Sequence, residues 1–160
     1  MHPLALAARS AALALLLGLT ALACGGQEDG VVLADMEAQT HALINAERQA
    51  QGLPALAWEA LIADAARGHS RDMSSGQVEF GHDGFDARVD ALAEQLPWSS
   101  AGENVAWNQG YPDPAAQAVE GWMDSPGHRE NILGDYDRTG IGIAGDATDG
   151  YYFTQIFLRD

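Results

Sequence analysis

The chain has 160 residues, 23 of them acidic and 8 basic, and its formal net charge at pH 7 is −15. A negative field of this size repels nucleic acid and anionic lipid headgroups, which excludes both as binding partners. The length suits one domain of ordinary size, without internal repeats or a run of coiled-coil heptads.

The first 23 residues are predicted to be an export signal. Arg9 supplies the positive start, and residues 11–22 are almost entirely Ala and Leu. This run is too short to span a bilayer as a stable helix, but it suits the apolar part of a signal peptide. It ends in Ala-Leu-Ala before Cys24, which is similar both to a signal peptidase site and to the lipobox of bacterial lipoproteins. The lipobox usually has Leu at the position of Ala21.

Cys24 is the only cysteine, so no internal disulfide can form. Its place at the cleavage point favours lipid attachment, and the alternative is an unmodified Cys at the mature N-terminus. We therefore expect an exported protein that is either secreted or anchored to a membrane through this lipid alone. Residues 24–32 are expected to be a flexible polar tether, and residues 33–160 the folded domain.

Two helices are predicted in the first half of the domain. The first covers residues 33–51 and is stopped by Gly52. The second carries apolar residues from Trp58 to Met73 at steps of three and four, which is the spacing of one helix face. We expect Trp58 to be buried on that face.

Two further helices follow. A short third helix is predicted after the Asp-Gly pair at 83–84. The fourth begins with Asp113 as N-cap and Pro114 at the first helical position. A Pro-Gly pair at 126–127 is expected to end it, which places His128 just beyond a helix end.

Three strands complete the predicted elements. Residues 140–144 and 151–158 are rich in apolar, β-branched or aromatic residues, and the Asp-Gly turn within residues 146–150 joins them as a hairpin. Residues 105–107 are predicted to form another strand. Helices and antiparallel strands mix without a βαβ rhythm, so the fold class is α+β.

Four blocks of sequence are informative in combination. They are residues 43–48 with 52–58, residues 66–73 with 80–82, residues 102–106, and residues 119–133 with 152–157. The third contains Gly-Glu-Asn, and the fourth contains Ser-Pro-Gly-His-Arg-Glu-Asn-Ile-Leu. On these motifs the chain resembles bacterial members of the CAP superfamily (cysteine-rich secretory, antigen 5 and pathogenesis-related proteins) over about residues 36–158. The resemblance implies a three-layer α-β-α sandwich with an antiparallel sheet.

The resemblance also implies a cleft. Eukaryotic members line it with two His and two Glu, which in some cases hold a divalent metal. Matched position by position, His82 and Glu103 correspond to one His and one Glu of that set. Ser125 stands at the position of the second Glu and Tyr152 at that of the second His, so half of the set is missing. His128 is the local candidate to replace the missing imidazole.

The candidate ligands for Zn or another divalent metal are His82, Glu103 and His128, with His69 as a further imidazole. Each residue also has a structural interpretation. His69 could be a core-edge residue bonded to backbone, and His128 could stabilise a helix end through the helix dipole. Glu103 could accept hydrogen bonds from loop N–H groups, and His82 could be an exposed loop residue.

Two functions remain open. The favoured one is a binding module that uses the His/Glu-lined cleft for a lipid, a peptide or an envelope ligand. The alternative is a divalent-metal-dependent, peptidase-like hydrolase. No catalytic residue is assigned, because Cys24 lies in the tether, a Gly-x-Ser-x-Gly motif is absent, and Ser125 near His128 is weak support for a triad. We expect a monomer.

Lipid attachment at Cys24 gives the first testable prediction. Wild-type protein should incorporate a palmitate analogue and fractionate with membranes, whereas Cys24→Ser should be unlabelled and soluble because no thiol remains to carry lipid. Metabolic labelling followed by fractionation measures both. A soluble, unlabelled wild-type protein would show that Cys24 is not an anchor.

Overall fold

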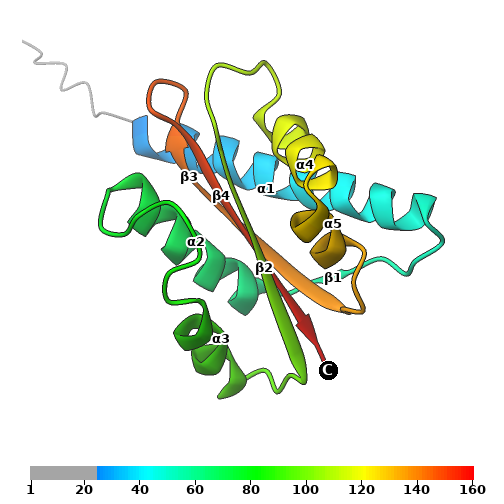
Figure 1. Ribbon diagram of the computed structural model, residues 1–160. Coiled ribbons are helices and arrows are strands. Elements are labelled where there is room, and N and C mark those ends of the chain that lie inside the picture. Colours follow the sequence, from blue (N-terminus) through cyan, green and yellow to red (C-terminus); the bar gives the residue numbers. More distant parts are fainter. Residues whose placement is uncertain (1–24) are drawn as a thin grey trace, which may run out of the picture.

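The middle layer of the fold is a four-stranded sheet (Figure 1). The computed structural model describes residues 25–160. The strand order is β1-β3-β4-β2, and the strands are β1 Ala57–Trp58, β2 Ser100–Asn108, β3 Arg138–Asp146 and β4 Gly150–Arg159. The short β1 runs parallel to β3, and the other neighbours are antiparallel. Strand β2 therefore forms one edge of the sheet.

Helices cover both faces of this sheet. Figure 1 shows α1, α4 and α5 on one face and α2 and α3 on the other. Their bounds are α1 Gly25–Ala50, α2 Ala60–Ser74, α3 Phe85–Ala93, α4 Pro114–Asp124 and α5 Pro126–Ile132. The α+β class and the three-layer arrangement are thus confirmed. No helix in residues 25–160 has the length and apolar character needed to cross a membrane.

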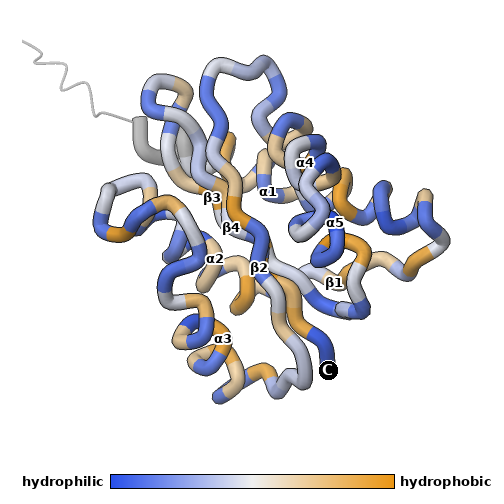
Figure 2. Tube along the Cα trace, in the orientation of Figure 1, coloured by the Kyte–Doolittle hydropathy of each residue, from blue (hydrophilic) through white to orange (hydrophobic). Residues whose placement is uncertain are grey.

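Each face of the sheet has its own hydrophobic core. The larger core lies under α1, α4 and α5, and Trp122, Phe153 and Phe157 are its bulkiest members. The smaller core lies under α2 and α3 around Ile62 and Ile156. Hydrophobic residues recur along the strands and the helices, while most loops are hydrophilic (Figure 2).

Helix α2 lies unusually close to the sheet because β3 carries glycine where the two meet. A Cβ atom added at Gly140 would lie 2.1 Å from the backbone nitrogen of Ala63, and one at Gly142 would lie 2.0 Å from that of Arg67. The side-chain hydroxyl of Ser70 also donates to the Gly142 carbonyl at 2.8 Å. Any larger residue at these two positions of β3 would push α2 away from the sheet.

A buried arginine joins α1 to the segment that follows α5. Arg48 is 1% exposed and donates to carbonyl oxygens on both sides. Its partners are the carbonyls of Pro54 at 2.9 Å, Ile132 at 2.8 Å, Gly134 at 2.9 Å and Tyr136 at 3.2 Å. Burial lowers the pKa of Arg48 from its ordinary value. These bonds compensate for taking the guanidinium out of water.

Two expected boundaries differ from the structure in the first half of the chain. Helix α1 begins at Gly25, so residues 25–32, expected as a tether, lie within it; no proline interrupts this stretch. Cys24 and the export signal lie outside the described residues. The placement of Trp58 on the second helix was wrong, because residues 57–58 pair with β3 and Glu59 caps α2 by accepting from the Leu61 N–H.

The region after the fourth predicted helix also differs. Helix α4 ends at Asp124, but Pro126 opens a second helix, α5, instead of a loop. Ser125 between them is extended, with φ −94° and ψ 119°. Proline disfavours the helical conformation in the residue before it, yet it suits the first position of a new helix. His128 therefore lies in the first turn of α5, and the helix-end interpretation of this residue was wrong.

The tryptophans of α4 and β1 differ sharply in burial. Trp122 is 1% exposed, whereas Trp58 is 37% exposed. Trp122→Ala should therefore lower the free energy of unfolding by about 3–5 kcal/mol, and Trp58→Ala by about 1–2 kcal/mol because less apolar surface returns to water. Urea denaturation of both variants is the measurement. Equal losses would contradict the two burials.

Candidate functional site

Glu103 is the centre of a charged cluster on the edge strand β2. Its side chain is only 2% exposed. Arg88 of α3 donates to both carboxylate oxygens, with Nη2 at 2.7 Å from Oε2 and 2.9 Å from Oε1. His82 donates from Nδ1 to Oε1 at 3.0 Å. Since an ionised carboxylate only accepts, this bond assigns the Nδ1 hydrogen of His82 and leaves Nε2 free.

Arg88 is a member of this cluster that the sequence did not reveal. It faces the carboxylate from α3, and its Nη1 also donates to the Asp83 carbonyl at 2.7 Å. It therefore ties the loop that carries His82 to the sheet. The sequence held one general indication of such a pair. All eight basic residues are arginines among 23 acidic ones, and a buried carboxylate needs a basic partner.

His69 supports the same loop from α2. It is 3% exposed, and its Nε2 lies 2.8 Å from the Gly81 carbonyl oxygen, to which it donates. This is the structural interpretation of His69, a core-edge residue bonded to backbone. Its bond fixes the residue directly before His82.

His128 approaches His82 from the opposite layer. The two imidazole rings lie 6.5 Å apart between centroids. Asn104 of β2 donates from Nδ2 to the His128 carbonyl at 3.1 Å, which holds the first turn of α5 against the edge strand. Burial, and to a smaller extent the charge of His82, lowers the pKa of His128 below its ordinary value of 6.5. The neutral imidazole is thus favoured near pH 7.

The family-like motifs meet at this edge. Asn131 of α5 donates from Nδ2 to the Glu103 carbonyl at 3.1 Å and to Asn104 Oδ1 at 2.9 Å. A Cβ at Gly102 would lie 2.6 Å from the Tyr136 hydroxyl and 3.0 Å from Asn131 Oδ1. Glycine therefore precedes Glu103 because side chains from the segment after α4 fill the space above it.

A cavity of about 420 Å³ runs between β2 and α4 beside this cluster. Its volume falls in the range of about 300–1,000 Å³ typical of small-ligand sites. Ser125 and His128 line it, whereas His82 and Glu103 do not. The full lining is Val105, Ala106, Trp107, Asn108, Gln109, Tyr111, Gln117, Ala118, Gly121, Trp122, Ser125 and His128.

Tyr152 belongs to an aromatic row next to this cavity. It is paired with Trp107 across β2 and β4, and their ring centroids lie 6.5 Å apart. The ring centroid of Phe80 lies 6.4 Å from that of Tyr152. Phe80 is 54% and Trp107 46% exposed. Tyr152 thus stands at the position of the missing imidazole, within a row of aromatic rings that no sequence motif indicated.

The cluster does not fit a divalent metal. Both oxygens of Glu103 are engaged by the Arg88 guanidinium, whose positive charge opposes a cation at the same place. Within residues 25–160, no group of three His, Cys, Asp or Glu side chains is arranged to hold a metal ion. The positions of the second Glu and second His carry a hydroxyl and a phenol, which are poor substitutes.

The remaining chemistry is that of hydrogen bonding. His82 is oriented by Glu103 and half exposed, so its Nε2 can accept a hydrogen bond or a proton from a bound molecule. Ser125 makes no side-chain hydrogen bond to either imidazole among the described residues. The pairing of hydroxyl and base that activates a serine nucleophile is therefore not formed here.

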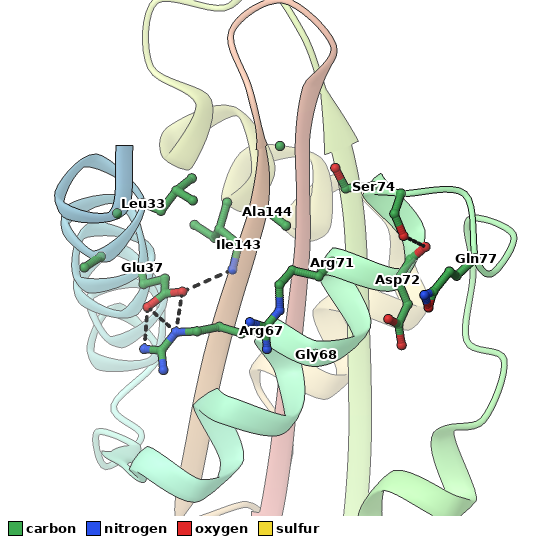
Figure 3. A pocket seen from close by; sticks show the side chains of 14 residues that line it. Leu33, Glu37, Arg67, Gly68, Arg71, Asp72, Ser74, Gln77, Ile143 and Ala144 are labelled. Atoms are coloured by element: carbon green, nitrogen blue, oxygen red, sulfur yellow. Dashed lines mark hydrogen bonds and ion pairs between the residues drawn. The ribbon is translucent and has the colours of Figure 1, made fainter. Parts of the chain in front are cut away.

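A larger cavity of about 910 Å³ lies at the opposite side of the sheet, between α1, α2 and β3. Figure 3 shows Glu37 of α1 bonded both to Arg67 of α2 and to the Ile143 N–H of β3. These bonds hold the three elements together. None of the predicted site residues lines this cavity.

Solved structures of bacterial proteins share this architecture. An extracellular SCP-domain protein from Bacillus anthracis superposes with a TM-score of 0.69 at 31% identity, covering 81% of this chain and 42% of its own. An outer surface protein from Borrelia burgdorferi gives a TM-score of 0.64 at 17% identity, covering 78% and 92%. The second match, at this low identity, demonstrates the fold alone.

The chain belongs to the cysteine-rich secretory protein (CAP) family, whose model matches residues 41–157. Two relatives come from Bacillus subtilis. The membrane protein YlbC is 39% identical over 127 residues, and YkwD is 36% identical over 119 residues. They match 77% and 72% of this chain, which spans only 34% and 44% of their own lengths.

The environment of His128 gives a pH-dependent prediction. NMR titration should place its pKa below 6.5, and His82→Gln should raise it by removing the smaller of the two causes. Below about pH 6.5, the imidazole of His128 binds a proton in the unfolded chain before it does so in the folded chain. The free energy of unfolding therefore decreases as the pH falls, until the pH reaches the pKa of His128 in the folded chain. His41→Gln, on α1, should leave this titration unchanged. An unshifted His128 would contradict the burial.

Proposed function

We propose that this domain is an extracellular or surface-held binding module whose ligand occupies the cavity between β2 and α4. One observation carries the proposal. Asn104, Asn131 and Trp122 use their side chains to brace the backbone around the cavity, while Ser125 and the His128 ring, which line it, form no side-chain hydrogen bond with another described residue. A braced frame around uncommitted polar groups is the arrangement of a preformed binding site.

Relatives support the location. The Bacillus anthracis protein is extracellular, the Borrelia protein lies at the outer surface, and YlbC is a membrane protein. The export signal and lipid attachment at Cys24 agree with such a place and remain part of this proposal. The ligand classes left open by the sequence are a lipid, a peptide or another envelope component.

Binding is favoured over hydrolysis by the state of Glu103. A carboxylate that accepts three hydrogen bonds from Arg88 and one from His82 is fully engaged. It orients His82 and neutralises buried charge, which are positioning roles. A metal-dependent reaction would need this carboxylate free for the metal.

A glycine on α4 offers a test that does not disturb the fold. Gly121 lines the cavity, and nothing lies within 4 Å of an added Cβ. Gly121→Leu should fill the cavity and abolish ligand binding. The free energy of unfolding should stay the same or rise by up to about 1 kcal/mol, because leucine favours helix over glycine. Native mass spectrometry with a cell-envelope extract of the producing organism measures binding.

The matched control is Gly68→Leu. Gly68 lies within α2, lines the cavity between α1, α2 and β3, and also has nothing within 4 Å of an added Cβ. It should leave binding intact. If Gly68→Leu removes the bound ligand and Gly121→Leu does not, the ligand site is the other cavity and the proposal is wrong.

A further inference from the structure

The cavity between β2 and α4 lacks charged carboxylate and guanidinium side chains, although the chain is strongly acidic. Its lining contains no Asp, Glu or Arg. Four other cavities of the described residues each include at least one carboxylate: Glu37 and Asp72, Asp124 and Glu130, Asp113, and Asp160. His128 is its one titratable imidazole, and burial favours the neutral form. A lining of this kind suits an uncharged ligand.

The polar groups that do line the cavity are both donors and acceptors. Among the described residues, no hydrogen bond engages the side chains of Gln117, Ser125 and Tyr111 or the His128 ring, and the Trp107 N–H has no acceptor. Amides, hydroxyls and a neutral imidazole each offer both functions, and the indole adds a donor. A ligand rich in hydroxyl groups can use all of them.

Exposed aromatic rings flank these groups. Trp107 is 46% and Tyr111 49% exposed, and both line the cavity. The indole of Trp107 lies across Gly150, where an added Cβ would come within 2.6 Å of Nε1. Glycine at 150 therefore leaves room for this ring on the face of β2 and β4 that also carries Tyr152. Tyr152 and Phe80 extend the aromatic surface beyond it. Exposed aromatic faces of this kind suit ligands with flat apolar faces.

An extended peptide is a poorer match. Strand addition needs free carbonyl and N–H groups along a sheet edge. The Val105 carbonyl already accepts from Trp122 Nε1 at 2.9 Å, and the Glu103 carbonyl accepts from Asn131 Nδ2 at 3.1 Å. Side chains from α4 and α5 thus close this part of the edge. A proline-rich peptide would present acceptor carbonyls almost alone and leave half of the lining unused.

We propose that the cavity between β2 and α4 binds a neutral oligosaccharide, with sugar rings stacked on Trp107 and Tyr111 and their hydroxyls bonded to Gln117, Ser125 and His128. This inference rests on the proposed function and names the ligand class of the same site. The sugar faces bury aromatic surface that is otherwise exposed to water. The absence of carboxylates from the lining spares the ligand the repulsion that an acidic sugar would meet elsewhere on this chain.

Calorimetric titration of the purified exported protein tests the ligand class. The probes are chitotetraose and cellotetraose, which are neutral, tetragalacturonate, which is acidic, and decaproline. At least one neutral probe should bind, and tetragalacturonate should bind at least about tenfold more weakly. If neither neutral probe binds, or if the acidic probe binds as well as they do, the inference is overturned.

Variants locate the site. Trp107→Ala and Tyr111→Ala should each weaken binding of the neutral probe about tenfold, the order expected for losing a stacked aromatic ring. Trp58→Ala, at an exposed tryptophan of β1, should have no effect. Near-ultraviolet circular dichroism checks that the variants are folded. Unchanged affinity in both Trp107→Ala and Tyr111→Ala would refute the site.

The two proposals fail differently. Should decaproline bind in a Trp107-dependent way while both neutral sugars do not, the ligand class is wrong but the binding module stands. Should an envelope ligand remain bound to Gly121→Leu, the cavity itself is wrong and both proposals fall.

Discussion

The close approach of α2 to β3 is the contact on which the site depends. Glycine at 140 and 142 lets the backbone of α2 rest directly on the strand, where even a methyl group would collide with main-chain atoms. Placed there, α2 directs His69 toward the Gly81 carbonyl, which sets the start of the loop that presents His82. The two glycines of β3 thus help to position His82, because they set the place of α2 and α2 holds the loop before His82.

Each buried glutamate of the described residues is paired with an arginine. With few cations available, the chain gives its two buried glutamates one arginine each: Arg67 bonds Glu37 at 2.7 Å, and Arg88 bonds Glu103 at the same distance. Arg48, which is buried more deeply than either, has carbonyl oxygens as its hydrogen-bond partners. Removing one member of such a pair leaves a buried charge uncompensated, which costs more than the pair itself contributes. These arginines therefore specify how the layers fit together.

The sequence predicted elements whose signals are local. The stripe of α2, the Asp-Pro start of α4 and the turn before β4 each depend on neighbouring residues, and all three are in the structure. Strand β1 was missed because two residues carry no periodicity and gain their conformation by pairing with β3. Helix α5 was missed because the same proline that ends one helix can begin another.

The sequence predicted some residues of the candidate site but not their contacts. Family motifs identified His82, Glu103 and His128, which the structure brings together at one sheet edge. The ion pair of Glu103 with Arg88 and the exposed row of aromatic rings depend on tertiary contacts between distant segments, which spacing along the chain does not encode.

The carboxylate of Glu37 also bonds to the backbone of β3 at the edge of the sheet. On the side of β3 away from β4, β1 pairs with only Arg138 and Thr139, so the rest of that side borders no strand, and the Glu37 carboxylate accepts a hydrogen bond from the Ile143 N–H there. A buried acid thus fills a hydrogen-bonding position that an added strand would need at this edge.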